Sequence, residues 1–231
     1  MSGMPLLSPV GHELLDHPDA DPASVASSLH HIARANRWFG GWWAVRRGLT
    51  RLLAGVPRGN TLTLLDVGTG NGDLPARAVA WAARRGIRLV PIGLERHPTA
   101  AALTRARGIA TVLGCAGALP IRPRSVDLVL ASQLAHHLSA AANVEFFQAV
   151  SQAARLGVVI ADLRRSRLAL AGFWIGSRIF GFDAATRADG LTSVMRGFLP
   201  GELAALCRRA GIAAEVERSP GFRLVASWRT A

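Results

Sequence analysis

The sequence predicts an α/β protein in which a mostly parallel β-sheet is covered on both faces by helices. Short apolar runs, such as residues 62–67 and 156–163, have the pattern of strands that are buried on both faces. Segments with helical periodicity alternate with these runs, which is the order of βαβ units. Hydrophobic residues make up 50% of the 231 residues, which is enough for one well-filled core.

The centre of this pattern is a strand that is followed by a glycine-rich turn. Gly68, Gly70 and Gly72 occupy every second position after the strand, and a helical pattern comes next. Because glycine has no Cβ, a ligand can approach this backbone closely, and the helix start offers free N–H groups. Asp66 and Asp73 flank the turn. Their carboxylates favour a cationic or hydrogen-bond-donating ligand over a bare phosphate.

The spacing of the turn excludes two common nucleotide-binding motifs. The dinucleotide motif G-x-G-x-x-G fails because its third glycine position holds Asp73 or Pro75. The phosphate-binding loop G-x-x-x-x-G-K-[ST] requires lysine, and the chain has none. The remaining pattern, D-x-G-x-G-x-G from Asp66 to Gly72, resembles motif I of the class I S-adenosylmethionine-dependent methyltransferases. A tight turn that binds nothing is the alternative.

Two further stretches extend the resemblance. Glu95 follows the predicted strand 88–94, about 20 residues beyond the turn, where a carboxylate meets the ribose of a nucleotide-like ligand. Residues 114–120 match the family pattern G-D-A-x-x-L-P except that Cys115 replaces the aspartate that caps the adenine amino group. The backbone of Ala116 can supply part of that contact. We expect Cys115 to be packed rather than reactive, since it has no basic neighbour in sequence.

The resemblance covers the chain from about residue 60 to the C-terminus and implies a Rossmann-like sheet of seven strands with an antiparallel last strand. A hairpin of residues 213–217 and 222–228 would form the antiparallel end. The implied cofactor is S-adenosyl-L-methionine. The residues that the resemblance assigns to its binding are Asp66, Gly68, Thr69, Gly70, Asn71, Gly72, Asp73, Glu95, Arg96, Cys115, Ala116, Ser132 and Gln133.

Ahead of this domain, residues 1–59 are predicted to form a loose arm and a helical cap. The arm ends near residue 20, and a helix runs from an Asp21 N-cap to about Ala35. Residues 36–41 break it, and a second helix spans about 42–53. The aromatic residues at the break either attach the cap to the domain or form a wall over an active site; they are Trp38, Phe39, Trp42 and Trp43.

The rest of the chain has the alternation expected of the family. Strands are predicted at 109–113 and 125–131, and helices up to about 85 and at 98–107, 143–154 and 200–210. An apolar insert at about 166–196 begins with the run from Leu168. It is too short to span a bilayer. It can be an ordinary packed helix, a lid over an apolar pocket, or a surface that touches a membrane.

The catalytic candidates are His136 and His137, which the resemblance places beside the transferred methyl group. Imidazole is the side chain whose unperturbed pKa lies nearest neutrality. We favour His136 as the base because it is closer to the strand end, with Asp162 as the reserve. No metal is expected, because adjacent side chains on a regular element point apart and no acidic residue lies nearby in sequence.

Charge and cysteine content limit the choice of partner. The chain has 27 basic and 15 acidic residues, a net charge of +12, which permits binding to nucleic acid or an anionic membrane. The arginines are dispersed, however, and the chain has neither tyrosine nor an N-P-P-Y-like motif for flipped bases. Two distant cysteines, the absence of a signal-peptide pattern and the absence of a run of membrane-span length favour a cytoplasmic protein.

The sequence therefore favours a methyltransferase that acts on oxygen or carbon of a small apolar acceptor of the aromatic, polyketide or quinone type, as in secondary metabolism. An RNA or protein methyltransferase is one alternative. A non-catalytic binding subunit that kept the fold is the other, and the cysteine at position 115 is the feature that favours it. The oligomeric state stays open.

Overall fold

The computed structural model describes residues 13–14, 17 and 19–230, so most of the predicted N-terminal arm lies outside the described residues. Seven strands form one sheet in the order β3-β2-β1-β4-β5-β7-β6. The strands are β1 (Thr61–Val67), β2 (Arg88–Glu95), β3 (Ala110–Leu113), β4 (Val126–Ser132), β5 (Ala154–Leu163), β6 (Glu215–Ser219) and β7 (Arg223–Arg229). The first five are parallel, and β7 runs antiparallel to both of its neighbours. The predicted mostly parallel sheet is confirmed.

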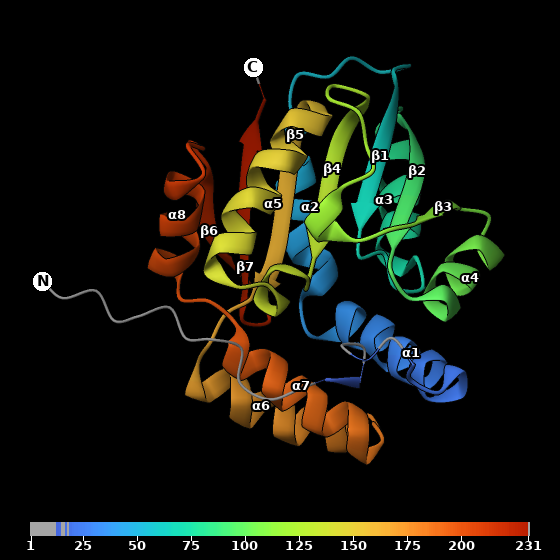
Figure 1. Cartoon of the computed structure of the whole chain (residues 1–231), viewed down its shortest axis with the longest axis vertical. Coiled ribbons are helices and arrows are strands. Elements are labelled where there is room, and N and C mark those ends of the chain that lie inside the picture. The colour runs from blue at the N-terminus through green and yellow to red at the C-terminus, as the bar shows by residue number, and fades with distance from the viewer. Residues whose placement is uncertain (1–12, 15–16, 18, 231) are drawn as a thin grey trace, which may run out of the picture.

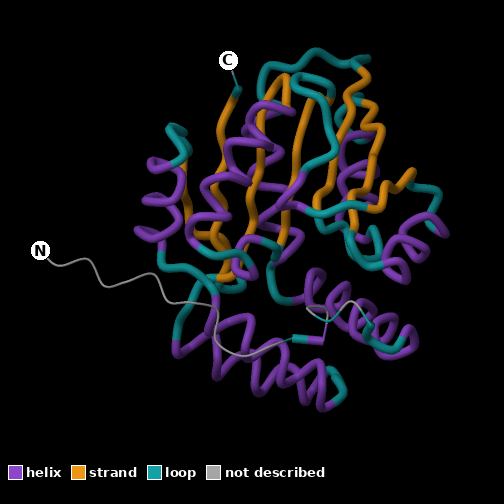
Figure 2. The backbone as a smooth tube through the Cα atoms, in the orientation of Figure 1, coloured by secondary structure: helices purple, strands orange, loops and turns teal. Residues whose placement is uncertain are grey.

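Helices cover both faces of the sheet (Figure 1; Figure 2). They are α1 (Pro22–Trp38), α2 (Gly41–Leu52), α3 (Asp73–Ala83), α4 (Pro98–Ala106), α5 (Ala140–Ala153), α6 (Arg167–Ile179), α7 (Ala184–Arg196) and α8 (Pro200–Arg209). The side chains of α5 and α8, among them Phe146 and Leu203, pack on one face of the sheet. Those of α2 and α3, among them Leu49 and Trp81, pack on the other face. The central strand β1 is therefore buried from both sides, as its apolar sequence predicts.

The first helix is longer than the sequence predicts. Asp21 caps it as expected, since its carboxylate accepts the N–H of Ser24. The helix continues past Ala35 to Trp38 because Asn36 finds polar partners inside the fold. It ends before Gly40, which has φ +82°; a Cβ there would lie 2.1 Å from the carbonyl oxygen of Pro220. This contact fixes the turn that leads into α2.

The insert forms two packed helices, α6 and α7, rather than one. Together with α1 they gather at the end of the sheet to which the β1 arrow points (Figure 1). Gly190 lies against the ring of Phe173, where a Cβ would come within 2.1 Å, so the two helices are in close contact. The predicted division of the chain between residues 59 and 60 stays a prediction, although α2 packs directly on β5 and β7.

The four cap aromatics do not form one wall. Phe39 packs edge-on against Phe173 and Phe180, so this residue does attach the cap to the insert. Trp42 packs against Trp81 of α3. Trp38 and Trp43 expose half or more of their surface.

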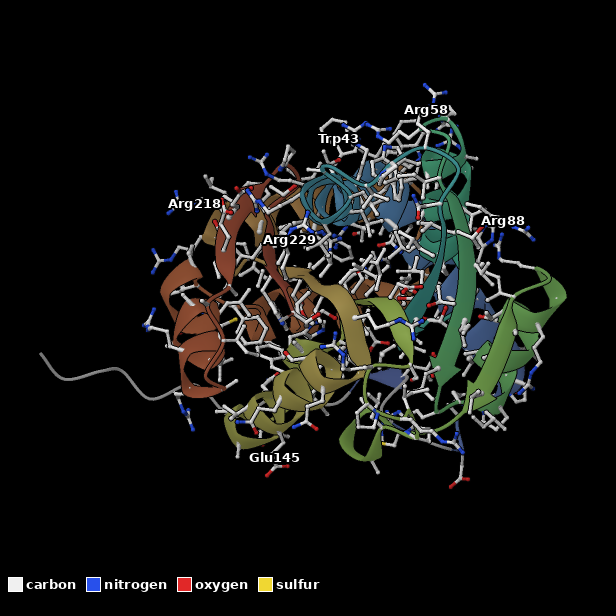
Figure 3. The ribbon with its side chains drawn as sticks, turned by 90° about the horizontal axis from the view of Figure 1, so that it is seen from above. Trp43, Arg58, Arg88, Glu145, Arg218 and Arg229 are labelled. Carbon is white, nitrogen blue, oxygen red and sulfur yellow. The ribbon has the colours of Figure 1, made fainter. Side chains whose placement is uncertain are left out.

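The chain is basic, and three of its exposed arginines lie far apart on the surface. Figure 3 shows Arg58, Arg88 and Arg218 projecting from separate edges of the molecule. Among the described residues, no helix has the length and apolar character needed to cross a membrane.

Candidate active site

A cavity of about 280 Å³ lies between the carboxyl ends of β1, β2 and β4 and the helices α1, α6 and α7. Ligands bind at this edge in open α/β sheets. All but one of the predicted site residues line it: Asp66, Gly68, Thr69, Gly70, Asn71, Asp73, Glu95, Arg96, Cys115, Ala116, Ser132, Gln133, His136 and His137. The exception, Gly72, lies behind the turn, where a Cβ would be 3.1 Å from side-chain atoms of Ile109 and Thr104.

The glycine turn has the backbone that its sequence requires. Gly68, Gly70 and Gly72 have φ values of +71°, +59° and +75°, in the left-handed region. The N–H of Gly70 donates to a carboxylate oxygen of Glu95 over 2.9 Å, which links the turn to the end of β2. The other oxygen of Glu95 accepts the N–H groups of Arg96 at 2.8 Å and His97 at 3.1 Å. These three bonds hold the carboxylate in one orientation and leave about one of its four acceptor sites, on the oxygen that faces Gly70, for a ligand hydroxyl group.

Three carboxylates meet in the cavity and favour a cationic ligand. Burial, assisted by the charges of Asp73 and Glu95, raises the pKa of Asp66 to about 8. Burial also raises the pKa of Asp73, although its hydrogen bond from Asn36 lowers it. A bound cation would relieve this repulsion and lower both pKa values. The site therefore fits S-adenosyl-L-methionine, whose sulfonium and ammonium groups are cationic and whose ribose carries hydroxyls.

Helix α1 is joined to the turn by a polar network that the sequence did not reveal. The buried amide of Asn36 donates to both oxygens of Asp73, at 3.2 and 3.3 Å, and accepts from Gln133 over 2.7 Å. Gln133 has φ +55°, a strained value for a non-glycine residue. The network connects the cap, the glycine turn and the end of β4 across the cavity. In the sequence, the one indication of this network is the polar residue Asn36 within the segment 36–41 that is expected to break the helix.

The two candidates His136 and Asp162 form a pair. Nδ1 of His136 lies 2.7 Å from Oδ1 of Asp162, and both residues are buried. Asp162 also accepts the backbone N–H of His136 at 3.2 Å and of Leu163 at 2.7 Å. Burial acts to raise the pKa of Asp162, but the charge and hydrogen bonds of His136 hold it below its usual value. In the neutral form of His136 the ionised carboxylate assigns the imidazole proton to Nδ1 and leaves the lone pair on Nε2.

The two histidines do not point apart, and the expectation that no acidic residue lies near them is wrong. Both belong to a single 3-10 turn, Ala135–His137, and their ring centroids are 4.2 Å apart. Glu13 reaches them from the distant N-terminal segment. Its carboxylate lies 3.9 Å from Nε2 of His136 and 3.7 Å from Nε2 of His137. Sequence spacing carries no sign of this contact.

These three side chains bring ligand atoms within 4.8 Å of one another, which is a spacing that a metal ion could use. Arg196 also contacts this cluster, because its guanidinium lies 3.0 Å from Glu13 and 3.3 Å from Nδ1 of His137. Ser193 donates to the other oxygen of Glu13 over 2.8 Å. Donation from Arg196 to Nδ1 puts the proton of a neutral His137 on Nε2, so that nitrogen has no lone pair for a metal.

Cys115 is exposed, and the expectation that it is packed is wrong. Its sulfur accepts the N–H of Gly117 over 3.4 Å at the mouth of the cavity. The 3-10 turn that follows, Ala116–Ala118, leaves this side chain outside the core.

Comparison with known proteins agrees with this geometry. Residues 65–161 match the family model described as "Methyltransferase domain". No curated protein is similar enough in sequence to match the chain. A methyltransferase structure from Aquifex aeolicus, titled as SAM dependent, has 13% identity and a TM-score of 0.63 and covers 91% of this chain and 99% of its own.

Two other structures extend the comparison. Magnesium protoporphyrin IX methyltransferase from Synechocystis PCC 6803, solved with SAH, has 13% identity, a TM-score of 0.54 and coverage of 83% and 84%. Human N-acetylserotonin methyltransferase, solved with SAM, has 11% identity, a TM-score of 0.60 and coverage of 91% of this chain and 57% of its own. At these identities the likeness concerns the fold, while the family model identifies the domain. Residues 65–161 therefore match a methyltransferase domain, the chain has the fold of class I methyltransferases, and the structures solved with SAM or SAH point to S-adenosyl-L-methionine as the ligand of this edge of the sheet.

Proposed function

We propose that the chain methylates an oxygen or carbon of a small apolar acceptor of the aromatic, polyketide or quinone type, and that His136 is the general base. The pair formed by His136 and Asp162 beside the glycine turn carries this proposal. A buried imidazole with its Nδ1–H on a carboxylate has the tautomer and orientation that a base requires. In this proposal the cofactor is bound by the twelve residues of the assigned thirteen that line the cavity, and Gly72 supports the turn from behind.

The walls of the cavity support an apolar acceptor. Phe173, Phe182 and Val194 line it on the side of α6 and α7, and Leu163 lines it at the end of β5. These side chains offer contact area to a flat ring but no base-specific hydrogen bonds. Arg58, Arg88 and Arg218 project from separate edges of the molecule (Figure 3), which does not favour one continuous RNA-binding surface.

The cofactor and the protein contribute different parts of the reaction. When bound, the cofactor supplies an electrophilic methyl group, so the protein chiefly positions the acceptor and removes its proton. A phenol with a pKa near about 10 is mostly protonated at neutral pH. Nε2 of His136 takes that proton, and the ionised Asp162 stabilises the resulting imidazolium. In this proposal the acceptor oxygen binds within hydrogen-bond reach of Nε2 of His136.

The proposed acceptor class can be tested without knowing the acceptor. The purified chain is incubated with methyl-labelled cofactor and an extract of the cells that encode it, and the products are separated into organic-soluble, RNA and protein fractions. We expect the label in the organic fraction, because Leu163, Phe173, Phe182 and Val194 give the proposed acceptor side of the cavity an apolar wall. Label recovered with RNA or with protein would contradict this proposal and indicate an RNA or a protein methyltransferase instead.

We also expect the reaction to need no metal ion. Arg196 neutralises Glu13 and contacts His137, so the cluster with ligand-like spacing has its charge already balanced. Label transfer should keep its rate after exhaustive chelation and dialysis. A rate that falls on chelation and returns with Mg²⁺ or Zn²⁺ would contradict this assignment.

A further inference from the structure

The outer face of α6 is the most apolar exposed surface among the described helices. Leu168 is 71% exposed, Ile175 52% and Ile179 75%, and Trp174 lies beside them, half exposed. The spacing of seven and four residues places the three aliphatic side chains on one side of the helix. Soluble monomeric proteins seldom expose such an apolar stripe to water, so we expect a partner molecule or a membrane to cover it.

The charged residues of α6 itself, Arg167 and Arg178, are both positive. Residues 163–182 contain no Asp or Glu but include Arg164, Arg165, Arg167 and Arg178. The guanidinium of Arg178 lies 3.7 Å from the ring centroid of Trp174, at the edge of the apolar stripe. Arg165 is paired with Glu202, while Arg167 is exposed at the start of the helix.

The face continues onto α1. The exposed ring of Trp38 stacks on Phe180 with a centroid distance of 5.9 Å, and Arg37 lies 5.0 Å from the centre of the same tryptophan ring. Two elements far apart in sequence therefore present the same combination, an exposed tryptophan with an arginine over it. Aliphatic side chains, tryptophan and flanking arginine are the composition of helices that lie in the interface of an anionic bilayer.

The opposite side of α6 faces the active-site cavity. Phe173 lines the cavity, and Gly176 packs against Phe39, where a Cβ would come within 2.7 Å. One helix thus separates the outer apolar face from the space in which the acceptor is proposed to bind. Movement of α6 would connect the two, and a hydrophobic acceptor could pass between them without crossing water.

We infer that the outer face of α6, with Trp38, docks the protein on the surface of an anionic lipid bilayer. Charge complementarity favours lipid as the occupant: the stripe is apolar, and the two charged residues of α6, Arg167 and Arg178, are both basic. Arginine stems can lie along the acyl boundary while their guanidinium groups meet lipid phosphates. Docking itself does not depend on the proposed function; delivery of the acceptor from the bilayer does.

The test is co-sedimentation of the full chain with vesicles of phosphatidylcholine alone or with one-quarter phosphatidylglycerol, without cofactor or acceptor. We expect binding to the mixed vesicles that weakens with salt, and little binding to the neutral ones. The variant Ile175→Ser with Ile179→Ser should bind at least about tenfold more weakly, since it removes the apolar stripe. Arg178→Gln should lose about fivefold, the equivalent of one surface charge.

The matched control is Val112→Ser with Leu113→Ser, which removes two exposed apolar side chains from the edge strand β3, well away from α6 in Figure 1. It should bind vesicles as the wild type does. Wild-type protein that stays in the supernatant with both vesicle types would overturn the inference, as would equal binding by the α6 variant. If the same α6 substitutions instead dissociate a dimer, a second copy is the occupant and the inference is wrong. Failure of methyl transfer with intact vesicle binding would count against the proposed function alone.

Discussion

His136→Ala should slow methyl transfer at saturating cofactor by roughly 10²- to 10⁴-fold at pH 7. The reason is that Nε2 carries the lone pair that accepts the proton of the acceptor, while Nδ1 is held by Asp162 over 2.7 Å. The deficit should shrink as the pH rises toward the pKa of the acceptor hydroxyl, because solvent then removes the proton. The measurement is the rate of label transfer across pH 6 to 10.

His137→Ala provides the comparison, since its ring lies beside His136 but its Nδ1 contacts Arg196 rather than a carboxylate. We expect a smaller loss of rate from this variant, and no change in cofactor affinity from either one. If both variants keep the wild-type rate at pH 7, neither histidine is the base and the enzyme acts by positioning alone.

Gly70→Val should abolish cofactor binding. Gly70 has φ +59°, and the nearest atom to an added Cβ is Cδ2 of Leu29 at 3.2 Å, so the branched side chain would project into the cavity between the turn and α1. It would also displace the N–H that donates to Glu95. Titration calorimetry with S-adenosylmethionine measures the loss.

A valine at positive φ is strained wherever it stands, so the control is Gly108→Val. Gly108 has φ +76° and no neighbour within 4 Å of an added Cβ, and it lies outside the cavity. The Gly108→Val variant should bind cofactor as the wild type does, and its free energy of unfolding should fall by an amount similar to that of Gly70→Val. Glu95→Ala should weaken binding by roughly 1–3 kcal/mol, because charge-assisted hydrogen bonds are lost. Unchanged affinity in both Gly70→Val and Glu95→Ala would contradict the cofactor site.

The sheet and its cofactor edge could be predicted because they depend on local pattern. Strands buried on both faces are continuous apolar runs, and the glycines after β1 are required by their backbone angles. The position of Glu95 follows from the order of parallel strands, since β2 lies next to β1 and ends at the same edge.

The acceptor side could not be predicted because its contacts join distant segments. Glu13 and Arg196 are 183 residues apart, and Asn36 and Gln133 are 97 apart, so no local spacing reports either contact. His136 and Asp162 were recognised singly, but their pairing depends on how the 3-10 turn after β4 faces the end of β5. The outward side chain of Cys115 depends on a second such turn, Ala116–Ala118.

The most direct test of the base assignment is the single-turnover rate of label transfer at pH 7 in wild type, His136→Ala, Asp162→Asn and the double variant, all saturated with cofactor. If Asp162 acts only by orienting His136 and stabilising its imidazolium, Asp162→Asn strongly slows the otherwise wild-type enzyme. The same substitution slows the His136→Ala variant little further, since the effects of residues that act as a unit are not additive. Two deficits that multiply in the double variant would show that the two residues act independently, and would contradict the account of a paired base at this cavity.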